Sequence, residues 1–509
     1  MKFAALMHLY QPYNQQEDVL SRIVNESYRP LMSGLKANPK IKLTVNITGT
    51  LTELLVKKGF TDVVTDLHLL ASRKQVELTG SAMYHTILPL LPKYEMSRQI
   101  SINNTINKKY LGKVFNPSGF FSPELAINAL VLREAVSQGC VWIAAPELSY
   151  GATLPSTTVL HKDEKTGLFV FFRNKRVSSL ILSAAVRDAQ QLWQETNDIH
   201  KSNYWFVVMD AETFGHHRIG HEKLLFEILT SPNFEPITIS ELLKEMTATA
   251  KVENVILRPC TWTNQEQDFW VSSNKTYILW KDPTNLIHKF QWQLANLAMK
   301  SVNAPEYKNP SKQTYSWRKA RKQLDIALAS DQFWWASAKP WWSLEMIESG
   351  AYALKQVLVT LNTNVAAAEK LYRNIIDKAF YWQRSGYVRR KHLATSGTYL
   401  KAPFKERAPA EWFNQVVLEF EFEMNAAVAK QDFERAIKWR DALLKIKQGT
   451  DIYDVLHVVD ELWLGRNVTW ATPLVKPFLQ HEWEEFSDFA KSCFRDVKSK
   501  EEFERWKGR

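Results

Sequence analysis

Seven short apolar runs in the first half of the chain constrain its fold more than any other feature. Most are apolar along most of their length instead of alternating with polar residues, which is typical of parallel strands that are buried on both faces. Stretches with helical periodicity, such as residues 62–72 and 128–138, lie between them. The alternation predicts an α/β fold, and seven strands favour an irregular seven-stranded (β/α) barrel over an open doubly wound sheet. The runs are Phe3–His8, Leu43–Thr48, Val76–Gly80, Gly119–Glu124, Val141–Glu147, Trp205–Glu212 and Pro236–Glu241.

The pattern changes after about Val255, where long helical periodicity replaces the short strands. An insertion at 159–182, with the runs FVFFR and VSSLIL, predicts an extra hairpin inside the first region. The long helices are expected over 287–299, 317–328, 344–361 and 365–381. The expected organisation is a barrel over 1–255, a helical domain over 256–415, a helical hairpin over 416–447 and a C-terminal helical segment over 448–509.

Composition excludes several classes of protein. With 45% apolar and 23% charged residues in 509 positions, the chain is an ordinary globular protein rather than a disordered or collagen-like one. No run approaches the roughly 18 apolar residues of a membrane span, and the three cysteines form no CxxC pair. We therefore expect a soluble, cytoplasmic protein without a membrane partner.

Charge and aromatic content bear on the partner. The formal charge of +11 is spread along the chain, so we expect no nucleic-acid partner from this pattern. Aromatic residues make up 12% of the chain, with 19 tryptophans, which suits stacking on sugars or a thick core.

Polar side chains follow several predicted strands where each strand stops. In a β/α barrel the reactive groups lie at these carboxyl ends, because the loops there surround one pocket. Carboxylates and histidines are costly to bury beside such apolar strands, so we expect them to converge on one site. They are His8, Tyr10 and Gln11 after the first strand, Glu77, Tyr84 and His85 at the third, Glu124 at the fourth, and Asp210, Glu212, His216 and His217 after the sixth.

Two of these carboxylates, Glu124 and Asp210, match the requirement of glycoside hydrolysis. One carboxylate attacks or stabilises the anomeric carbon and the other protonates the leaving oxygen, whose donor needs a raised pKa. Retention of configuration requires about 5–5.5 Å between the two carboxyl groups. Taken singly, each residue could instead cap the following helix or pair with an arginine.

The histidines open a second interpretation. His217 and His221 stand four residues apart, and His8 and His85 could converge on them to hold a metal ion. The sequence has no HExxH motif and no second closely spaced ligand pair. We therefore expect no metal and no cofactor, with His8, His85 and His217 as hydrogen-bond donors to a sugar.

The order of the motifs resembles glycoside hydrolase family 57, the α-amylase and 4-α-glucanotransferase family. The similar segments are HLYQP, QVELTGSAMYH, GFFSPE, MDAETFGHH and SDQFWW, which cover residues 8–335. The resemblance implies a (β/α)7 barrel with a helical domain that helps close the cleft, and retaining chemistry on α-1,4-glucans or maltooligosaccharides without a metal. It implies that Glu124 is the nucleophile and Asp210 the general acid/base.

The same resemblance extends the set of expected sugar contacts to Glu77, His85, Asp331 and the aromatic residues after Asp331. Tyr10 stands where the family has a histidine, and Phe121 differs from the usual tryptophan, so these departures affect substrate subsites more than the reaction. The expected substrate-binding residues are His8, Gln11, Glu77, His85, Glu212, His217, Asp331 and Trp334.

An aromatic run at 333–342 contains two pairs of adjacent tryptophans. Aromatic residues on a helix usually fill a core, so at least one member of each pair is expected to do so. Asp331 beside the run suggests that the other members face the cleft, and Trp334 is the expected sugar contact.

The segment 418–447 resembles the UVR motif of nucleotide-excision-repair subunits. The shared features are an acidic start, the alanines Ala426 and Ala427, DFERA at 432–436 and RD at 440–441. The pattern predicts two amphipathic helices broken at 430–432, with Asp432 as the N-cap of the second. The resemblance implies self-association or a protein partner through 416–447, and an internal hairpin is equally consistent.

Three classes of function stay open. The leading hypothesis is a retaining α-glucan hydrolase or glucanotransferase. A metal-dependent polysaccharide deacetylase, on a related seven-stranded barrel, is the second, although no adjacent aspartates follow the first strand. A non-catalytic interaction protein is the third. Hydrolysis and transglycosylation share one covalent intermediate, so the sequence does not distinguish them.

Overall fold

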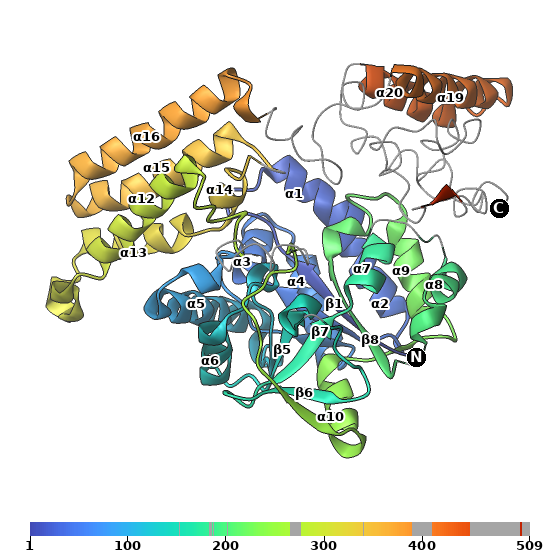
Figure 1. Cartoon of the computed structure of the whole chain (residues 1–509), viewed down its shortest axis with the longest axis horizontal. Helices are drawn as coiled ribbons and strands as arrows, with labels where there is room; N and C mark the ends of the chain where they lie inside the picture. Colours follow the sequence, from blue (N-terminus) through green and yellow to red (C-terminus); the bar gives the residue numbers. More distant parts are fainter. Residues whose placement is uncertain are drawn as a thin grey trace.

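The computed structural model describes most of the chain and places it in three parts. Figure 1 shows an α/β region in blue to green, a group of long helices in yellow to orange, and a separate helical hairpin. The expected C-terminal segment 448–509 lies outside the described residues, apart from 499–500. The described residues are 1–151, 153–182, 186, 188–200, 202–264, 276–338, 341–388, 410–447 and 499–500.

The strands of the α/β region form two sheets. They are β1 (Lys2–Leu9), β2 (Leu43–Ile47), β3 (Val76–Leu78), β4 (Gly119–Phe120), β5 (Trp142–Pro146), β6 (Leu160–Asp163), β7 (Phe169–Arg173), β8 (Tyr204–Asp210), β9 (Glu235–Pro236) and β10 (Val252–Val255). One sheet has the parallel order β3-β2-β1-β8, with β9 also paired to β1. The other has the order β10-β6-β7-β5-β4, in which β6 and β7 are antiparallel.

The two sheets approach each other along two edges. At one edge, a bridge joins Gly80, just beyond β3, to Phe120 of β4. At the other, the backbone N–H of Asn174 donates to the carbonyl of Phe206 in β8 at 2.7 Å. The predicted α/β class and its mainly parallel strands are confirmed, while the hydrogen-bond ladders divide into two sheets.

Alternate residues of β1 pack in two different cores. Ala4 and Leu6 pack with residues of both sheets, whereas Phe3 and Met7 pack with residues of the surrounding helices. This double burial explains why the strand is apolar at nearly every position. Because side chains alternate along a strand, His8 lies on the same inner face as Ala4 and Leu6.

Two predicted strands need correction. In the predicted strand Pro236–Glu241 only Pro236 is β-structure, because Thr238 and Glu241 form a capping box that begins the helix α10 (Ile239–Thr249). The run VSSLIL belongs to the helix α7 (Lys175–Leu182), in which the buried Val177 and Ile181 are spaced four residues apart. The antiparallel pair in this segment is therefore β6 and β7, and β7 also pairs in parallel with β5 of the same sheet.

Further helices surround the strands (Figure 1). They are α1 (Glu17–Ile23), α2 (Arg29–Ala37), α3 (Gly49–Lys57), α4 (Thr61–Ser72), α5 (Lys93–Leu111), α6 (Ala129–Ser137), α8 (Ala189–Glu195) and α9 (His221–Thr230).

The long helices occupy the positions that the sequence predicts. They share a core of their own, which also takes in a few residues of the α/β region, among them Ile87 and Leu91. The helices are α12 (Leu286–Val302), α13 (Tyr315–Ala327), α14 (Asp331–Trp334), α15 (Leu344–Leu361) and α16 (Val365–Arg384).

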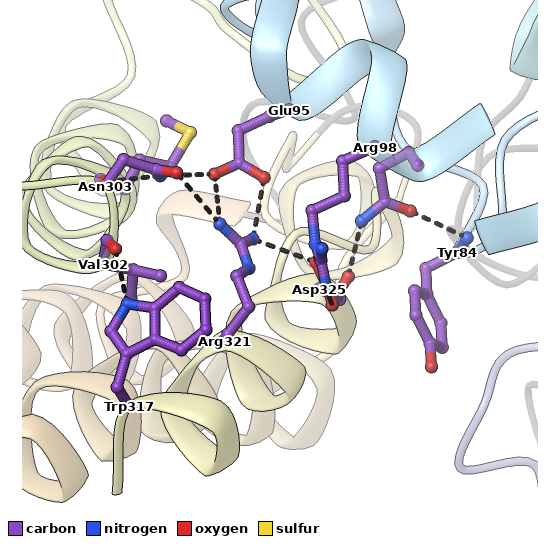
Figure 2. A network of polar contacts seen from close by, with 10 residues as sticks. Tyr84, Glu95, Arg98, Val302, Asn303, Trp317, Arg321 and Asp325 are labelled. Atoms are coloured by element: carbon purple, nitrogen blue, oxygen red, sulfur yellow. Dashed lines mark hydrogen bonds and ion pairs between the residues drawn. The ribbon is translucent and has the colours of Figure 1, made fainter. Parts of the chain in front are cut away.

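A buried ion-pair network joins α5 of the α/β region to α13 of the helical region (Figure 2). The guanidinium of Arg321 donates to both carboxylate oxygens of Glu95 at 2.7 Å and to Asp325 at 2.9 Å. Arg98 donates two further bonds to Asp325, both at 2.7 Å. The side chains of Glu95, Arg321 and Asp325 are at most 6% exposed, so water competes little with these bonds. The network fixes the end of α13 against the α/β region.

The hairpin consists of α19 (Ala410–Ala429) and α20 (Phe433–Lys447). The predicted N-cap is confirmed, because the carboxylate of Asp432 accepts a bond from the backbone N–H of Arg435 at 3.1 Å. Phe420 and Trp439 hold the helices together, with ring centroids 4.9 Å apart. Among the described residues, no helix combines the length and the apolar character that crossing a membrane requires.

Candidate active site

The strand register brings polar side chains of three neighbouring strands to one level. His8 of β1 pairs with Asn46 of β2 on one side and with Asp210 of β8 on the other. Paired residues of parallel strands point to the same face, here the inner one. Nδ1 of His8 lies 2.8 Å from Oδ1 of Asn46. The carboxyl ends of these strands therefore form the floor of a polar site.

Glu124 reaches this site from the turn after β4. Its φ of 60° and the φ of 47° at Leu125 are left-handed values, which cost energy in side-chain-bearing residues and often occur at functional sites. The Glu124 carboxylate accepts a bond from Nε1 of Trp262 at 2.7 Å and lies 4.0 Å from Nε2 of His85. Burial, together with the charge of Asp210, raises the pKa of Glu124 to about 8.

Asp210 shares this environment. Burial raises the pKa of Asp210 to about 6, against the lowering effect of the nearby Arg173. Arg173, at the end of β7, is held in place by a bond from Nε to the carbonyl of Val208 at 3.0 Å. A raised pKa is what a general acid needs, but the larger rise falls on Glu124, the expected nucleophile.

His8 and His85 lie in direct contact between the strands and the helical region. Their Nε2 atoms are 3.1 Å apart, and His85 has a left-handed φ of 51°. Burial lowers the pKa of His8 to about 4 and the pKa of His85 well below its ordinary value. Both rings are therefore neutral near pH 7.

Glu212 lies just beyond Asp210 and is 5% exposed. Its carboxylate accepts bonds from Nε2 of Gln11 at 3.1 Å, from the backbone N–H of Tyr10 at 3.3 Å, and from the hydroxyl of Tyr28. Burial and the charge of Asp210 raise the pKa of Glu212 to about 7. The structure thus brings Gln11 and Glu212 together beside Asp210.

The helical region completes the site with two adjacent residues. Asp331 accepts a bond from the hydroxyl of Tyr10 at 2.6 Å, and the Tyr10 ring stacks on His85 with centroids 4.1 Å apart. Oγ of Ser330 lies 3.2 Å from Nδ1 of His85. Burial raises the pKa of Asp331. Asp331 is therefore brought to the site as expected.

Trp334 lies one helical turn after Asp331 and is partly exposed. Its ring centroid is 4.4 Å from that of Trp341 and 5.0 Å from that of Trp335. The neighbouring Phe333 is buried and stacks on Trp292 of α12 at 4.6 Å. All four paired tryptophans are partly exposed, and Trp334 and Trp342 are the pair members that pack against the helical core, so Trp334 contributes to the core as well as having an exposed part.

Glu77 lies elsewhere, which corrects the expectation that it contacts sugar at this site. In β3 it pairs with Thr44, two residues before the Asn46 that is level with His8, and two strand residues span about 6.6 Å. Its carboxylate accepts bonds from the backbone N–H of Ser240 at 3.0 Å and from Nε1 of Trp142 at 3.3 Å. These donors belong to the amino ends of α10 and β5, so Glu77 closes the opposite end of the sheets.

His217 and His221, which stand four residues apart, lie in different surroundings. His217 lies on an exposed turn, where its backbone N–H donates to the carbonyl of Glu212 at 2.8 Å. His221 is buried, and its Nε2 lies 2.7 Å from the carbonyl oxygen of Ile181. In the part of the chain that the structure describes, no group of three His, Cys, Asp or Glu side chains is placed to hold a metal ion.

Sequence reasoning missed several residues of the site. Asn46 could have been found, because it is a polar residue inside an apolar run. Arg173 ends a strand as His8 and Asp210 do, but the sequence pattern predicts that strand as part of the inserted hairpin. Trp262 lies outside the predicted strands, and only the structure shows its indole bonded to Glu124.

Residues 2–255 match the family model of Glycosyl hydrolase family 57. Over these residues the chain belongs to glycosyl hydrolase family 57. Residues 415–449 match the UvrB/uvrC motif. Both resemblances inferred from the sequence are therefore confirmed.

Individual family 57 relatives are matched over part of their length. Alpha-amylase 1 of Dictyoglomus thermophilum is 28% identical over 150 residues, which are 29% of this chain and 21% of that protein. The 4-alpha-glucanotransferase of Thermococcus litoralis is 30% identical over 132 residues, 25% of this chain and 19% of that protein. The matched part thus spans about a fifth of the length of these curated relatives.

Solved structures share the fold. The crystal structure of the Thermococcus litoralis 4-alpha-glucanotransferase gives a TM-score of 0.55 at 18% identity, covering 70% of this chain and 59% of that chain. A GH57-type branching enzyme of Pyrococcus horikoshii gives 0.55 at 16% identity, covering 75% and 95%. Both likenesses extend beyond residue 255, since they cover more of this chain than the family model does.

Proposed function

We propose that this protein is a retaining glycoside hydrolase or transglycosylase that acts on α-1,4-glucans. The observation that carries the proposal is the pair of buried carboxylates, Glu124 and Asp210, with raised pKa values inside a family 57 region. The matched relatives include an α-amylase and a 4-α-glucanotransferase, which supports an α-glucan or maltooligosaccharide as substrate.

In this proposal Glu124 attacks the anomeric carbon while Asp210 gives its proton to the leaving glycosidic oxygen. A glycosyl ester of Glu124 forms. Asp210 then removes a proton from water or from a sugar hydroxyl, which attacks the anomeric carbon and releases Glu124. Water gives hydrolysis and a sugar hydroxyl gives transglycosylation.

The proton must rest on Asp210 when the reaction begins. Because Asp210 raises the pKa of Glu124, the two carboxyl groups titrate as a coupled pair that shares one proton near neutral pH. The indole N–H of Trp262 stabilises the ionised form of Glu124. Trp262 therefore favours the protonation state in which Glu124 is the nucleophile.

The surrounding residues divide into two proposed roles. We place Asp331 and Trp334 against the sugar, because they belong to the facing helical region. His8 and His85, whose ring nitrogens bond to protein partners, line the site at the carboxyl ends of the strands and do not donate to the sugar in this arrangement. Gln11 and Glu212 bind each other, so we assign them to the support of Asp210. His217 lies on an exposed turn and is proposed for an outer subsite.

Incubation of the pure protein with maltoheptaose tests the proposal. Hydrolysis shortens the oligosaccharide and increases the number of reducing ends, whereas transglycosylation produces longer and shorter chains at a constant number of reducing ends. Either product ladder supports the proposal. An unchanged substrate across the pH range 5–9 would overturn it.

We also infer that the two sheets together form one irregular seven-stranded barrel. The bridge between Gly80 and Phe120 and the bond from Asn174 to Phe206 support closure at both edges. In this arrangement the helical region covers the end of the barrel at which the strands have their carboxyl ends. The seven barrel strands are β1, β2, β3, β4, β5, β7 and β8.

We propose that the protein is located in the cytoplasm, which cell fractionation tests.

The deacetylase alternative needs a bound metal ion. His221, which shares the required spacing with His217, directs Nε2 to a backbone carbonyl. Elemental analysis of active protein distinguishes the two reactions. One equivalent of zinc or manganese, lost together with activity on chelation, would favour the deacetylase.

A second proposal concerns the hairpin of α19 and α20, whose exposed apolar side chains favour association with another copy of the chain. Its outer face exposes large apolar side chains, with Leu418 62% and Phe422 63% exposed on α19 and Phe433 61% exposed on α20. Single exposed apolar residues are normal, but a stripe that continues through Ile437 and Leu444 is typical of an interaction site. We propose that this face pairs with the same face of a second copy.

Light scattering on the full chain tests this pairing. Phe422→Ser should lower the apparent mass from dimer to monomer and leave glucan turnover near that of the wild type. Lys430→Ala, at an exposed polar position of the same hairpin, is the matched control. A monomeric wild-type protein at micromolar concentration would contradict self-association.

A further inference from the structure

Arg173 is a buried cation with unused hydrogen-bond donors. It is 8% exposed, and in the part of the chain that the structure describes its only hydrogen bond runs from Nε to the backbone carbonyl of Val208 at 3.0 Å. Burial lowers the pKa of Arg173 to about 10, while the charges of Glu147 and Asp210 act in the opposite direction, so the guanidinium is positive near pH 7. Neither carboxylate forms an ion pair with it, and its two terminal NH2 groups have no acceptor among the described residues.

The two NH2 groups also keep an opening toward solvent. Among the described residues, the enclosed polar atoms without a partner include Nε of Arg321 but no atom of Arg173. Because the NH2 groups of Arg173 are unpaired and yet not enclosed, the exposed part of this side chain includes them. A molecule in the site can therefore reach these donors.

The strand geometry directs Arg173 to the inner face beside Asp210. Phe171, two residues earlier in β7, packs in the core that the two sheets share, so Arg173 lies on the same face. Val208 belongs to this core as well, and Asp210 follows it by two residues in β8. The bond from Arg173 to Val208 thus places the guanidinium next to the strand end that carries Asp210.

Trp262 holds the other side of the guanidinium. The central carbon of the guanidinium, Cζ, lies 5.7 Å from the centroid of the Trp262 ring, within the range of a cation–π contact. Trp262 is fixed in turn by Glu124, whose carbonyl accepts the Trp262 backbone N–H at 3.1 Å and whose carboxylate accepts its indole N–H at 2.7 Å. Val208 and Trp262 therefore orient Arg173 without using its NH2 groups.

The histidines of the site have no comparable free donors. Nδ1 of His8 lies 2.8 Å from Oδ1 of Asn46. Nδ1 of His85 lies 3.2 Å from Oγ of Ser330, and the Nε2 atoms of the two histidines lie 3.1 Å apart. Every ring nitrogen of the pair thus faces a protein atom. Arg173 offers a bound sugar the N–H groups that these histidines do not.

We propose that Arg173 is a substrate-binding residue, whose NH2 groups donate to two hydroxyl oxygens of the sugar unit on the leaving-group side. This assignment rests on the proposed function, in which Asp210 protonates the glycosidic oxygen that leads to that unit. Neutral hydroxyls fit this place better than an anion does, because Asp210 and Glu147 put negative charge around the guanidinium. The rigid, planar fork can reach two neighbouring hydroxyls of one sugar ring.

The sugar unit on this side is exchanged during transglycosylation. After Glu124 has taken the glycosyl group, the leaving sugar departs and an acceptor takes its place beside Asp210, which removes the proton of the attacking hydroxyl. Arg173 binds the acceptor as it bound the leaving sugar. It therefore favours attack by a sugar hydroxyl over attack by water.

Three variants of the full chain separate the planar fork from the charge. Arg173→Lys keeps a positive charge but lacks the fork, and Arg173→Met lacks both. Lys162→Met is the matched control, because Lys162 is also a cation over an aromatic ring, with Nζ 5.4 Å from the centroid of Phe169. Phe169 and Arg173 are the two end residues of β7, so the control lies away from the site.

Two substrates distinguish the two sides of the site. α-Maltosyl fluoride carries no leaving sugar, so its kcat/KM for fluoride release depends on the donor side alone, whereas maltoheptaose places sugars on both sides. For maltoheptaose we expect kcat/KM to fall about tenfold or more in Arg173→Lys and in Arg173→Met, and to stay unchanged in Lys162→Met. For the fluoride we expect all three variants to stay within about twofold of the wild type, which also shows that they are folded.

Transfer to an added sugar gives the second readout. With α-maltosyl fluoride as donor and maltose as acceptor, we expect the ratio of transfer to hydrolysis to fall about tenfold in Arg173→Lys and to stay unchanged in Lys162→Met.

Several results would overturn this role of Arg173 while leaving the proposed function in place. They are wild-type rates on maltoheptaose in Arg173→Lys, an equal loss on both substrates, and a wild type that cleaves both substrates but transfers nothing to maltose. A wild type that turns over neither substrate would overturn the proposed function, and the role of Arg173 with it.

Discussion

Two groups of buried carboxylates in this molecule differ in what surrounds them. Where α5 meets α13, Glu95 and Asp325 accept charged hydrogen bonds from Arg321 and Arg98. In the candidate site, Glu124 accepts a bond from the neutral indole of Trp262, and its pKa and that of Asp210 are raised. Arginine pairing assigns the first group to structure. In the second group burial outweighs the nearby charge of Arg173, and the raised pKa values suit the proton transfer that we propose.

The largest expected effect comes from removing either carboxylate of the second group. Glu124→Gln and Asp210→Asn should each lower glucan turnover by at least about 10³-fold, because each removes a reacting group. Thermal unfolding should stay near that of the wild type or rise, since a costly buried carboxylate is lost. Initial rates and calorimetry measure both effects. Near-normal turnover in either variant would overturn the assignment.

The first group should respond in the opposite way. Arg321→Met leaves Glu95 and Asp325 without their shared partner, so we expect a loss of about 3–5 kcal/mol in the free energy of unfolding. Arg176→Met is the matched control, because its pair with Asp198 is exposed, and we expect a loss below about 1 kcal/mol. Denaturant titration of both variants measures the two losses in the free energy of unfolding. Equal losses would remove the distinction between the two groups.

The pH dependence of stability sharpens the comparison further. Glu124 has a pKa of about 8 in the folded state against an ordinary 4.5, so the folded state holds more protons than the unfolded state between these values. Its contribution to stability is therefore present below about pH 4.5 and is lost as the pH rises to about 8. We expect the wild type to lose stability relative to Glu124→Gln over this range. Unfolding midpoints at several pH values test the sign, which a constant difference would contradict.

A smaller effect is expected at the aromatic edge of the site. Trp334→Ala should weaken maltooligosaccharide binding by about 1–3 kcal/mol if the ring stacks on a sugar. Trp292→Ala is the control, because Trp292 is buried against Phe333 and its loss should lower stability without changing affinity. Calorimetric titration on the inactive Glu124→Gln background measures affinity. Unchanged affinity in Trp334→Ala would place this residue in the core.

Much of the fold could be predicted because burial leaves a direct pattern in the sequence. A strand covered on both faces, such as β1, must be apolar throughout, and a polar residue at its end, such as His8, is then conspicuous. The start of α10 could also be predicted from the sequence, because Thr238 and Glu241 have the spacing of a capping box. The apolar character of Pro236–Glu241 instead predicts a strand, which is wrong beyond Pro236.

The remainder of the site depends on register and docking, which a single sequence does not display. Glu77 follows the same strand pattern as His8, but pairing with Thr44 places it one layer lower. Trp262 and Ser330 enter from outside the predicted strands, so their roles depend on how distant segments pack. The apolar stripe of the hairpin was predictable, whereas its exposure required the structure.

Covalent labelling tests the central claim, that Glu124 is the nucleophile of a retaining reaction, most directly. A 5-fluoro-α-glucosyl fluoride slows release of a glycosyl ester, so the enzyme accumulates the intermediate that the proposed mechanism requires. Peptide mass spectrometry should find the sugar on Glu124 in the wild type and in Asp210→Asn, and no label in Glu124→Gln. A label on Asp210, or turnover with inverted anomeric configuration, would contradict this account.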